Sequence, residues 1–417
     1  MSQALNFEET TPICFTLPNG IRVIHRACSG QVSCCGYVVN AGSRHDSELE
    51  SGIAHFTEHM LFKGTSHRKA HHILNRMEAV GAELNAYTTK EEIFVYAQFL
   101  EKDYLRATDL LTDLFFNSVF PESEIEKERL VILDEINSYE DSPSELIFDD
   151  FEDLLFAHHP IGRKILGTPE SLERFNQETF KTFHAQNFKT DNIVFFSQSS
   201  IPFKQWNKII ERVVGQIPTN TQGDRRVITK PIPQTGLRTS VDKDTHQAHV
   251  LLGTRSYDFN DNNRVGMYLL NNILGGPGMN SRLNIALRER LGLVYSVESN
   301  VTSYSDSGVF SIYFGTDHQN LDRCMNLVKK ELKNLRTHAL TPLQLHAAQK
   351  QLFGQMMISS EQKEGSSLSM GKSMLHFNRF DSLKEISDKV LSFKASELQN
   401  IANELLDFDK MCILEYR

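Results

Sequence analysis

The sequence has 417 residues, a net charge of −9 and 40% hydrophobic residues, and this length favours two domains that each bury a core of their own. The charged fraction of 23% and the modest Gly and Pro content leave little room for long disordered segments. The acidic balance argues against nucleic acid as a partner, because phosphate binding needs a concentrated basic surface.

No segment approaches the roughly 20 consecutive apolar residues that a membrane-spanning helix requires. The stretch MSQALNFEETTPICF has no basic region followed by an apolar core, so it does not resemble a secretory signal. The six cysteines form no CxxC pair, and reduced thiols are typical of a reducing compartment. We therefore expect a cytoplasmic protein with no membrane partner.

The first predicted elements are strands. FTLPNGIRVIH indicates a hairpin around Asn19 and Gly20, and VSCCGYVVNAGS a further strand. After Gly52 the spacing of apolar and small residues favours a largely buried helix that ends near Gly64. AHHILNRMEAVG predicts a second helix, and AELNAYTTKEEIFVYAQF predicts a pair of strands.

Three more helices are predicted to begin near Asp103, Pro121 and Ser142. The last has a capping-box signature, SPSE, with Ser142 as the N-cap residue, Pro143 at the first helical position and Glu145 at the third.

The best linker candidate is IPTNTQGDRRVITKPIPQTGLR, which holds three prolines and two glycines with little periodicity. We therefore divide the chain into an N-terminal domain at 1–217, a linker at 218–238 and a C-terminal domain at 239–417. The second part repeats the first at low similarity, because GMYLLNNILGG resembles AHFTEHMLFKG and the order of strands and helices occurs twice.

The predicted helix after Gly52 carries His55, Glu58 and His59. On a helix, His59 lies about 40° from His55 and Glu58 about 60° away on the other side, so all three share one face. Two imidazoles at this spacing can hold one zinc ion, while a carboxylate beside them can take a proton from a metal-bound water. The order H-x-x-E-H is inverted relative to the commoner H-E-x-x-H zinc helix. The alternative is three polar residues on a half-exposed helix, which the apolar neighbour Phe56 argues against.

A catalytic zinc needs a third protein ligand and one open position for water. The predicted helix in PESEIEKERLVILDEINSYE offers Glu124, Glu128 and Glu135, which are spaced four and seven residues apart and form one stripe. A glutamate stripe is more often a solvated helix face. Geometry alone does not choose among the three.

The motif from His55 to His59, followed by Glu135 in VILDEI, resembles the inverted-motif zinc peptidases. These include pitrilysin, the insulin-degrading enzyme and the β subunit of the mitochondrial processing peptidase. The stretches TLPNGIRVIH, FKGT, LNAYTTKEE, ILDEINSYEDSP and HPIGRKILGTPESL resemble the short-chain bacterial branch of that family, over most of residues 15–175. The later half matches more loosely, through NSRLNIALRERLGLVYSV and GVFSIYFGT.

The resemblance implies roles for these residues. Glu135 is expected to be the third ligand of one Zn²⁺ per chain, beside His55 and His59. Glu58 is expected to be the catalytic general base. Glu128 matches a family glutamate that supports the ligands without binding the metal.

Two further groups resemble the substrate-binding residues of the family. Arg288 and Tyr295, in RERLGLVY, resemble the arginine–tyrosine pair with which the C-terminal half reaches the bound peptide. A guanidinium and a phenol can donate hydrogen bonds to a carbonyl oxygen that becomes an oxyanion; read alone, these residues are a helix-surface cation and an ordinary strand residue. The family's edge strand, whose free backbone groups pair with the substrate, is matched by Asn85, Ala86, Tyr87 and Thr88.

By resemblance we expect an α+β fold with two homologous halves, each an antiparallel sheet flanked by helices, arranged as a clamshell. A chain of this length is expected to form a homodimer that encloses a chamber. The expected function is a zinc-dependent endopeptidase acting on short or unstructured peptides. The second half is expected to bind no metal, because Gln349 and Met356 stand at the positions matching Glu128 and Glu135.

Two alternatives remain open. One is a subunit of an obligate heterodimeric processing peptidase, which is silent without another gene product. The other is a non-catalytic peptide-binding scaffold, because the family includes subunits that keep the fold and have lost the motif. The intact ligand set argues against the scaffold, and a zinc motif and an arginine–tyrosine pair in one chain favour self-sufficiency. Manganese or cobalt could occupy the same ligands.

Overall fold

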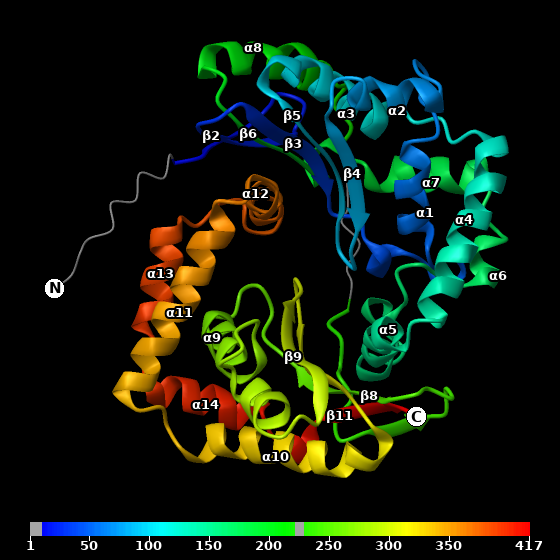
Figure 1. Ribbon diagram of the computed structural model, residues 1–417. Coiled ribbons are helices and arrows are strands. Elements are labelled where there is room, and N and C mark those ends of the chain that lie inside the picture. The colour runs from blue at the N-terminus through cyan, green and yellow to red at the C-terminus, as the bar shows by residue number, and fades with distance from the viewer. Residues whose placement is uncertain (1–10, 222–228) are drawn as a thin grey trace. The chain divides into compact units, whose positions relative to one another are not determined.

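A computed structural model describes residues 11–221 and 229–417. The contacts divide the chain into two compact units, and each unit contains one sheet and the helices that cover it (Figure 1). Among the described residues, the first unit comprises 11–136, 164–221 and 358–384, and the second comprises 137–163, 229–357 and 385–417.

The first sheet has six strands in the order β1-β2-β6-β3-β5-β4, and only β2 and β6 run parallel. The predicted hairpin joins β1 to β2, and Gly20 in its turn has a φ of +96°, a conformation that favours glycine. The strands are β1 (Ile13–Thr16), β2 (Arg22–Ala27), β3 (Val32–Val39), β4 (Glu83–Thr88), β5 (Ile93–Leu100) and β6 (Ile193–Ser199).

The second sheet has five strands in the order β7-β11-β8-β10-β9, and only β7 and β11 run parallel. Apart from β1, the two sheets match in order and direction, which confirms the prediction of two homologous halves. Each sheet departs from the expected antiparallel pattern at one pair, because helical connections allow β6 and β11 to return parallel to their neighbours. The strands are β7 (Arg238–Val241), β8 (Ala248–Arg255), β9 (Val294–Ser303), β10 (Gly308–Thr316) and β11 (Cys412–Tyr416).

Helices from the first half of the chain cover one face of the first sheet and enclose a large apolar core. The predicted strands and helices from the first hairpin to the helix near Ser142 all form, but the side chain of Ser142 makes no capping hydrogen bond. The helices on this face are α1 (Ile53–Leu61), α2 (Ala70–Glu78), α3 (Tyr104–Asn117), α4 (Glu122–Glu140), α6 (Pro169–Leu172), α7 (Gln177–Asn187) and α8 (Phe203–Val213).

Two helices are exchanged between the halves of the sequence (Figure 1). Helix α12 (Lys363–Phe377) belongs to the second half but packs on β2, β3 and β6 of the first unit. Helix α5 (Pro143–Leu155) belongs to the first half but packs on β8 and β11 of the second unit. The close approach of α12 requires Gly371, because a Cβ atom there would lie 2.6 Å from the ring of Phe196.

The predicted domains, 1–217 and 239–417, are contiguous in the chain. They therefore differ from the two units by α5, which belongs to the second unit, and α12, which belongs to the first. A local pattern does not reveal it, since it depends on which sheet a helix meets. Part of the predicted linker at 218–238, residues 222–228, lies outside the described residues.

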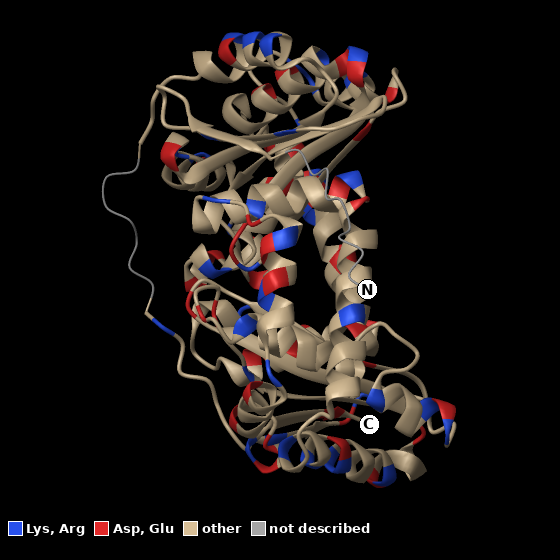
Figure 2. Ribbon diagram, turned by 90° about the vertical axis from the view of Figure 1, so that its left-hand side faces the viewer, with Lys and Arg blue, Asp and Glu red and all other residues tan. Residues whose placement is uncertain are grey.

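The second unit has its own apolar core, formed by the second sheet and helices of the second half. Strands β3, β5, β6 and β10 carry no charged residue, and the charged residues of the chain lie mainly on helices and loops (Figure 2). No helix among the described residues is long and apolar enough to cross a membrane. The remaining helices are α9 (Arg264–Gly275), α10 (Leu321–Thr337), α11 (Pro342–Ser360), α13 (Leu383–Ser392) and α14 (Ala395–Leu405).

The exchange of helices can be tested with the one tryptophan of the chain. Trp206 is buried in the first unit, and its indole N–H donates to the hydroxyl of Tyr104 at 2.8 Å. Met374→Ala, on α12, should lower the denaturant midpoint of the Trp206 fluorescence, because truncating a buried methionine costs about 2–5 kcal/mol. Leu155→Ala, a buried truncation on α5, is the matched control. A larger fluorescence shift for Leu155→Ala than for Met374→Ala would contradict the placement of the two helices.

Candidate metal centre

Helix α1 is buried along almost its whole length, and His59 is its one residue that is only half-buried. Its start depends on Gly52, which has a φ of +93° and whose backbone N–H donates to Asp46 at 2.9 Å. His55 is 7% exposed and Glu58 is 8% exposed. Buried polar groups are costly unless they have partners, so these side chains need compensation from neighbouring elements.

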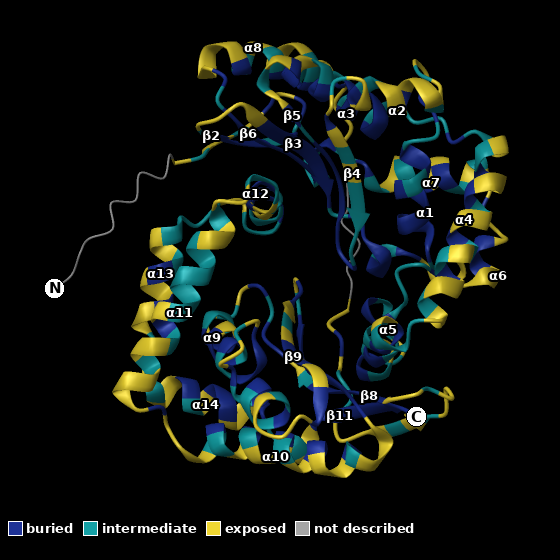
Figure 3. Cartoon of the chain, in the orientation of Figure 1, coloured by how far each residue is buried: buried dark blue, intermediate teal, exposed yellow. Residues whose placement is uncertain are grey.

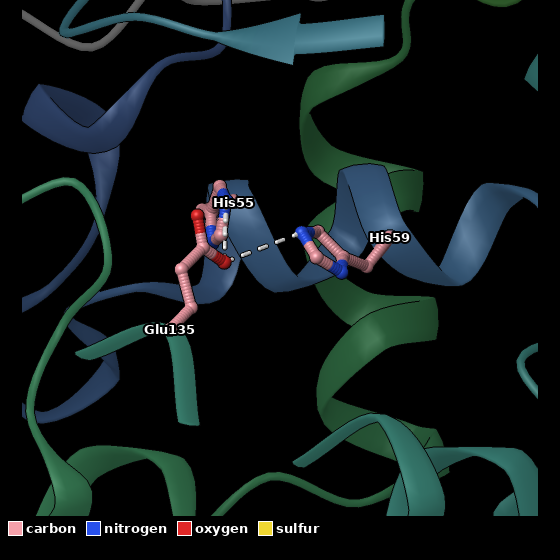
Figure 4. A group of neighbouring side chains, drawn as sticks. All are labelled: His55, His59 and Glu135. Atoms are coloured by element: carbon pink, nitrogen blue, oxygen red, sulfur yellow. Dashed lines mark ion pairs between the residues drawn. The ribbon is translucent and has the colours of Figure 1, made fainter. Parts of the chain in front are cut away.

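Three candidate metal ligands meet beside α1 (Figure 4). Glu135 reaches from α4 toward both histidines, and its Oε2 lies 3.8 Å from Nε2 of His55 and 3.8 Å from Nε2 of His59. The ligand atoms of the three residues lie within 4.8 Å of one another. A tetrahedral zinc site places its ligand atoms about 3.4 Å apart, so small movements would let one ion bind all three.

The surroundings of His55 favour the neutral imidazole that binds a metal. Burial and the charge of His59 lower the pKa of His55 to about 3, so its imidazole is neutral and able to bind a metal. Burial raises the pKa of Glu135, although the charge of His59 opposes this shift. The Nδ1 atom of His55 is buried and has no hydrogen-bond partner among the described residues. A two-histidine, one-carboxylate set is a common donor set for catalytic zinc.

Glu128 fixes the orientation of His59. Nδ1–H of His59 donates to Glu128 at 2.9 Å, which leaves the Nε2 lone pair directed toward Glu135 and the candidate ion. Burial alone would raise the pKa of Glu128, but hydrogen bonds from His59 and Lys63 lower it. Lys63, whose Nζ lies 2.5 Å from Glu128, was not predicted from the sequence. Its position four residues after His59 was the available signal.

The structure distinguishes the three glutamates among which the sequence geometry did not choose a third ligand. Glu135 faces both histidines, Glu128 lies behind His59, and Glu124 forms an ion pair with Lys127 at 2.7 Å. Only Glu135 therefore belongs to the candidate ligand cluster.

Glu58 lies beside this cluster without belonging to it. The hydroxyl of Thr88, at the end of β4, donates to its Oε2 at 2.6 Å. Burial raises the pKa of Glu58, and the hydrogen bond from Thr88 and the charge of His59 oppose that shift. A buried carboxylate beside a candidate metal site is placed to accept a proton and release it again.

Strand β4, which carries the four predicted substrate-binding residues, lies at the edge of its sheet and pairs only with β5 in the described chain. Figure 3 shows β4 as less buried than β3 and β5. Asn85 is exposed, whereas Ala86, Tyr87 and Thr88 are half-buried. The ring of Tyr87 stacks on Phe94 with a centroid distance of 4.7 Å. The outer backbone edge of β4 can therefore accept another strand.

The turn after β4 is fixed from two sides. Arg44 forms a buried ion pair with Glu91 at 2.6 Å. Lys372 and His376 of α12 lie 3.0 Å and 2.5 Å from Glu92. The potential ligand atoms of Glu91, Glu92 and His376 also lie within 4.8 Å of one another. Because basic side chains already balance these carboxylates, we assign no metal there.

Arg288 and Tyr295 lie in the second unit. Arg288 is half-buried on a π-helical turn, η7 (Asn284–Glu289), a feature that is frequent at functional sites. Tyr295 is 84% exposed on the edge strand β9.

The second half has no equivalent of the metal cluster among the residues that match it. The side-chain amide of Gln349 donates to the carbonyl groups of Val390, Leu391 and Phe393, at the end of α13. Met356 packs against the second apolar core.

The family model described as insulinase (peptidase family M16) matches residues 22–169, and the model described as peptidase M16 inactive domain matches residues 174–352. The uncharacterized zinc protease YmxG of Bacillus subtilis is 32% identical over 95% of this chain and 96% of its own length. An uncharacterized zinc protease of Rickettsia bellii is 32% identical over 88% of both chains.

Two solved structures share the fold. A protease from Helicobacter pylori has a TM-score of 0.89 and 20% identity, over 98% of this chain and 100% of that one. A peptidase M16 inactive domain from Pseudomonas fluorescens has a TM-score of 0.87 and 20% identity, over 97% of each chain.

Glu128→Gln should weaken zinc binding by about 10- to 100-fold, because it removes the carboxylate that orients His59. Glu124→Gln is the matched control, since Glu124 lies on the same helix and contacts Lys127 instead. Competition with a chromophoric chelator measures both affinities. Equal affinities in the two variants would contradict the role of Glu128.

The acid stability of the first unit should depend on Glu92. Burial alone would raise its pKa from 4.5, but the hydrogen bond from His376 and the charge of Lys372 hold it at about 2. Ionised Glu92 therefore stabilises the folded unit above its unfolded pKa, by about 3 kcal/mol, and this contribution is lost as the pH falls toward 2.

Urea unfolding followed by Trp206 fluorescence should show that Glu92→Gln is less stable than wild type near neutral pH. The difference should shrink as the pH falls below about 4.5. Glu83→Gln, at an exposed position of β4, should have little effect. A difference for Glu92→Gln that does not change with pH would contradict the assigned pKa.

Proposed function

The chain belongs to the insulinase family of peptidases, family M16, and from this membership we propose that it is a zinc-dependent endopeptidase. The observation that carries the proposal is the cluster of His55, His59 and Glu135, with Glu58 held beside it. A carboxylate that lies next to a metal site but is bonded elsewhere is suited to proton transfer.

In the proposed reaction, His55, His59 and Glu135 hold the metal. Zinc bound there would polarise the scissile carbonyl group and make a water molecule more acidic. Glu58 accepts a proton from the attacking water and then passes it to the leaving amine. Glu128 keeps the Nε2 atom of His59 directed toward the metal.

Short or unstructured peptides are the proposed substrates. The free edge of β4, at Asn85 to Thr88, can pair with an extended peptide backbone. A folded domain would have to unfold before it could present such an extended segment. Arg288 and Tyr295 are proposed to donate hydrogen bonds to the bound peptide, as the family resemblance implies. The enclosed chamber stays a prediction from that resemblance.

We further propose a homodimer in the cytoplasm. The dimer rests on the family resemblance, and the location on the six cysteines, all of which are free thiols. The competing functions are a subunit of an obligate heterodimer and a non-catalytic scaffold. The M16 inactive-domain match covers residues 174–352, outside the candidate metal cluster, so it does not favour the scaffold for the first unit.

Two substitutions separate metal binding from catalysis. Glu58→Gln should keep the metal and lose about 10²- to 10⁴-fold in peptide hydrolysis, because it removes the general base. His59→Ala should lose both. A mixed library of unstructured peptides, analysed by mass spectrometry beside the metal content of each protein, measures the two properties. Loss of metal in Glu58→Gln would show that Glu58 is a ligand and not the base.

The same assay distinguishes the alternatives when it is combined with light scattering. Cleavage by the purified wild-type chain in a dimeric fraction supports a self-sufficient enzyme. A metal-loaded wild-type chain that cleaves no peptide would overturn that proposal in favour of an obligate heterodimer or a scaffold.

A further inference from the structure

The carboxylate of Glu58 has a specific partner outside the metal cluster. Among the described residues, the one hydroxyl or amide group that donates to it is the hydroxyl of Thr88, at 2.6 Å from Oε2. The other oxygen, Oε1, accepts no hydrogen bond in the described chain. A hydrogen bond to a charged group is stronger than one between neutral groups, so this contact can fix which way the carboxylate faces.

The position of the Thr88 hydroxyl is itself well fixed. Thr88 is the last residue of β4 and pairs with Ile93 of β5. Because threonine is branched at Cβ, its χ1 angle has few accessible values. The hydroxyl therefore needs little reorganisation to hold Glu58.

The turn that follows keeps this end of β4 in place. The backbone N–H of Ser43 donates to the carbonyl group of Thr89 at 3.1 Å, and the N–H of Arg44 to that of Lys90 at 2.9 Å. The hydroxyl of Thr89 donates a hydrogen bond to the carboxylate of Glu92. Thr88 is thus held by β5 before it and by this turn after it.

We propose that Thr88 is a positioning residue for the general base. Its hydroxyl holds Oε2 of Glu58 and leaves Oε1 to receive the proton of the attacking water. This role rests on the proposed peptidase function and adds to the backbone role expected for β4. Thr88 therefore contributes its side chain as well as its backbone. Asn85, Ala86 and Tyr87 are expected to contribute only their backbone groups, through strand pairing.

The kinetic test compares Thr88→Val, which removes the hydroxyl at nearly constant shape, with Thr88→Ser, which keeps it. Thr88→Val should lower kcat by about 10- to 100-fold, the loss expected for one hydrogen bond to a charged group. Its KM and zinc content should stay near those of wild type, because the backbone of β4 and the metal ligands are unchanged. Thr88→Ser should recover most of kcat.

Thr302→Val is the matched control, since it removes an exposed threonine hydroxyl from β9, the corresponding edge strand of the second sheet. It should leave kcat unchanged. A kcat for Thr88→Val equal to that of wild type would overturn the inference. A higher KM with unchanged kcat would also overturn it, because it would assign the side chain to peptide binding.

A second measurement does not depend on activity. Crystal structures of wild type, Thr88→Val and Thr88→Ser should show one orientation of the Glu58 carboxylate in wild type and Thr88→Ser, and a rotated or divided one in Thr88→Val. The same single orientation in all three would overturn the inference, whether or not the protein cleaves peptides. If wild type binds zinc and cleaves nothing, the proposed function fails, and these structures still decide whether Thr88 orients the carboxylate of Glu58.

Discussion

Helix α1 carries an ionisable face into an almost completely buried position, and the neighbouring elements must compensate that face without bulk water. α4 contributes Glu128 and Glu135, and the end of β4 contributes Thr88. These contacts act differently on the side chains of α1. Glu128 orients His59, both histidines converge on Glu135, and Thr88 holds Glu58 outside that cluster. The proposed division between metal binding by the histidines and proton transfer by Glu58 thus follows from which neighbouring side chain contacts each residue.

The duplicated fold uses the same elements for different purposes in its two halves. Glu128 supports His59 in the first half, whereas its counterpart Gln349 caps the end of α13 with three hydrogen bonds. The second half retains the sheet and the helix order, so its fold does not require the metal cluster. The second half folds without the matching carboxylates, because Gln349 and Met356 make neutral contacts at those positions.

Sequence similarity predicted the repeat, and local periodicity was sufficient to predict the strands and helices from the first hairpin to the helix near Ser142 and the shared face of His55, Glu58 and His59. It did not select one glutamate from the stripe of α4, because that choice depends on how α4 packs against α1. The parallel strand pairs, the exchanged helices and the contact of Lys63 with Glu128 depend likewise on residues far apart in sequence. Thr88 was expected to act through its backbone, and the direction of its hydroxyl became visible only in three dimensions.

The exchanged helices have a consequence for biosynthesis. When the first half leaves the ribosome, one face of its sheet, which includes Ile24, Val38 and Phe196, remains uncovered until α12 has been made. α5 is available early, but the strands that it covers come later in the chain. Exposed apolar surface in a partly made chain favours aggregation. The nascent first half is therefore a stage at which a chaperone would protect the chain, and a gene fragment that ends at the linker would not encode a self-contained protein.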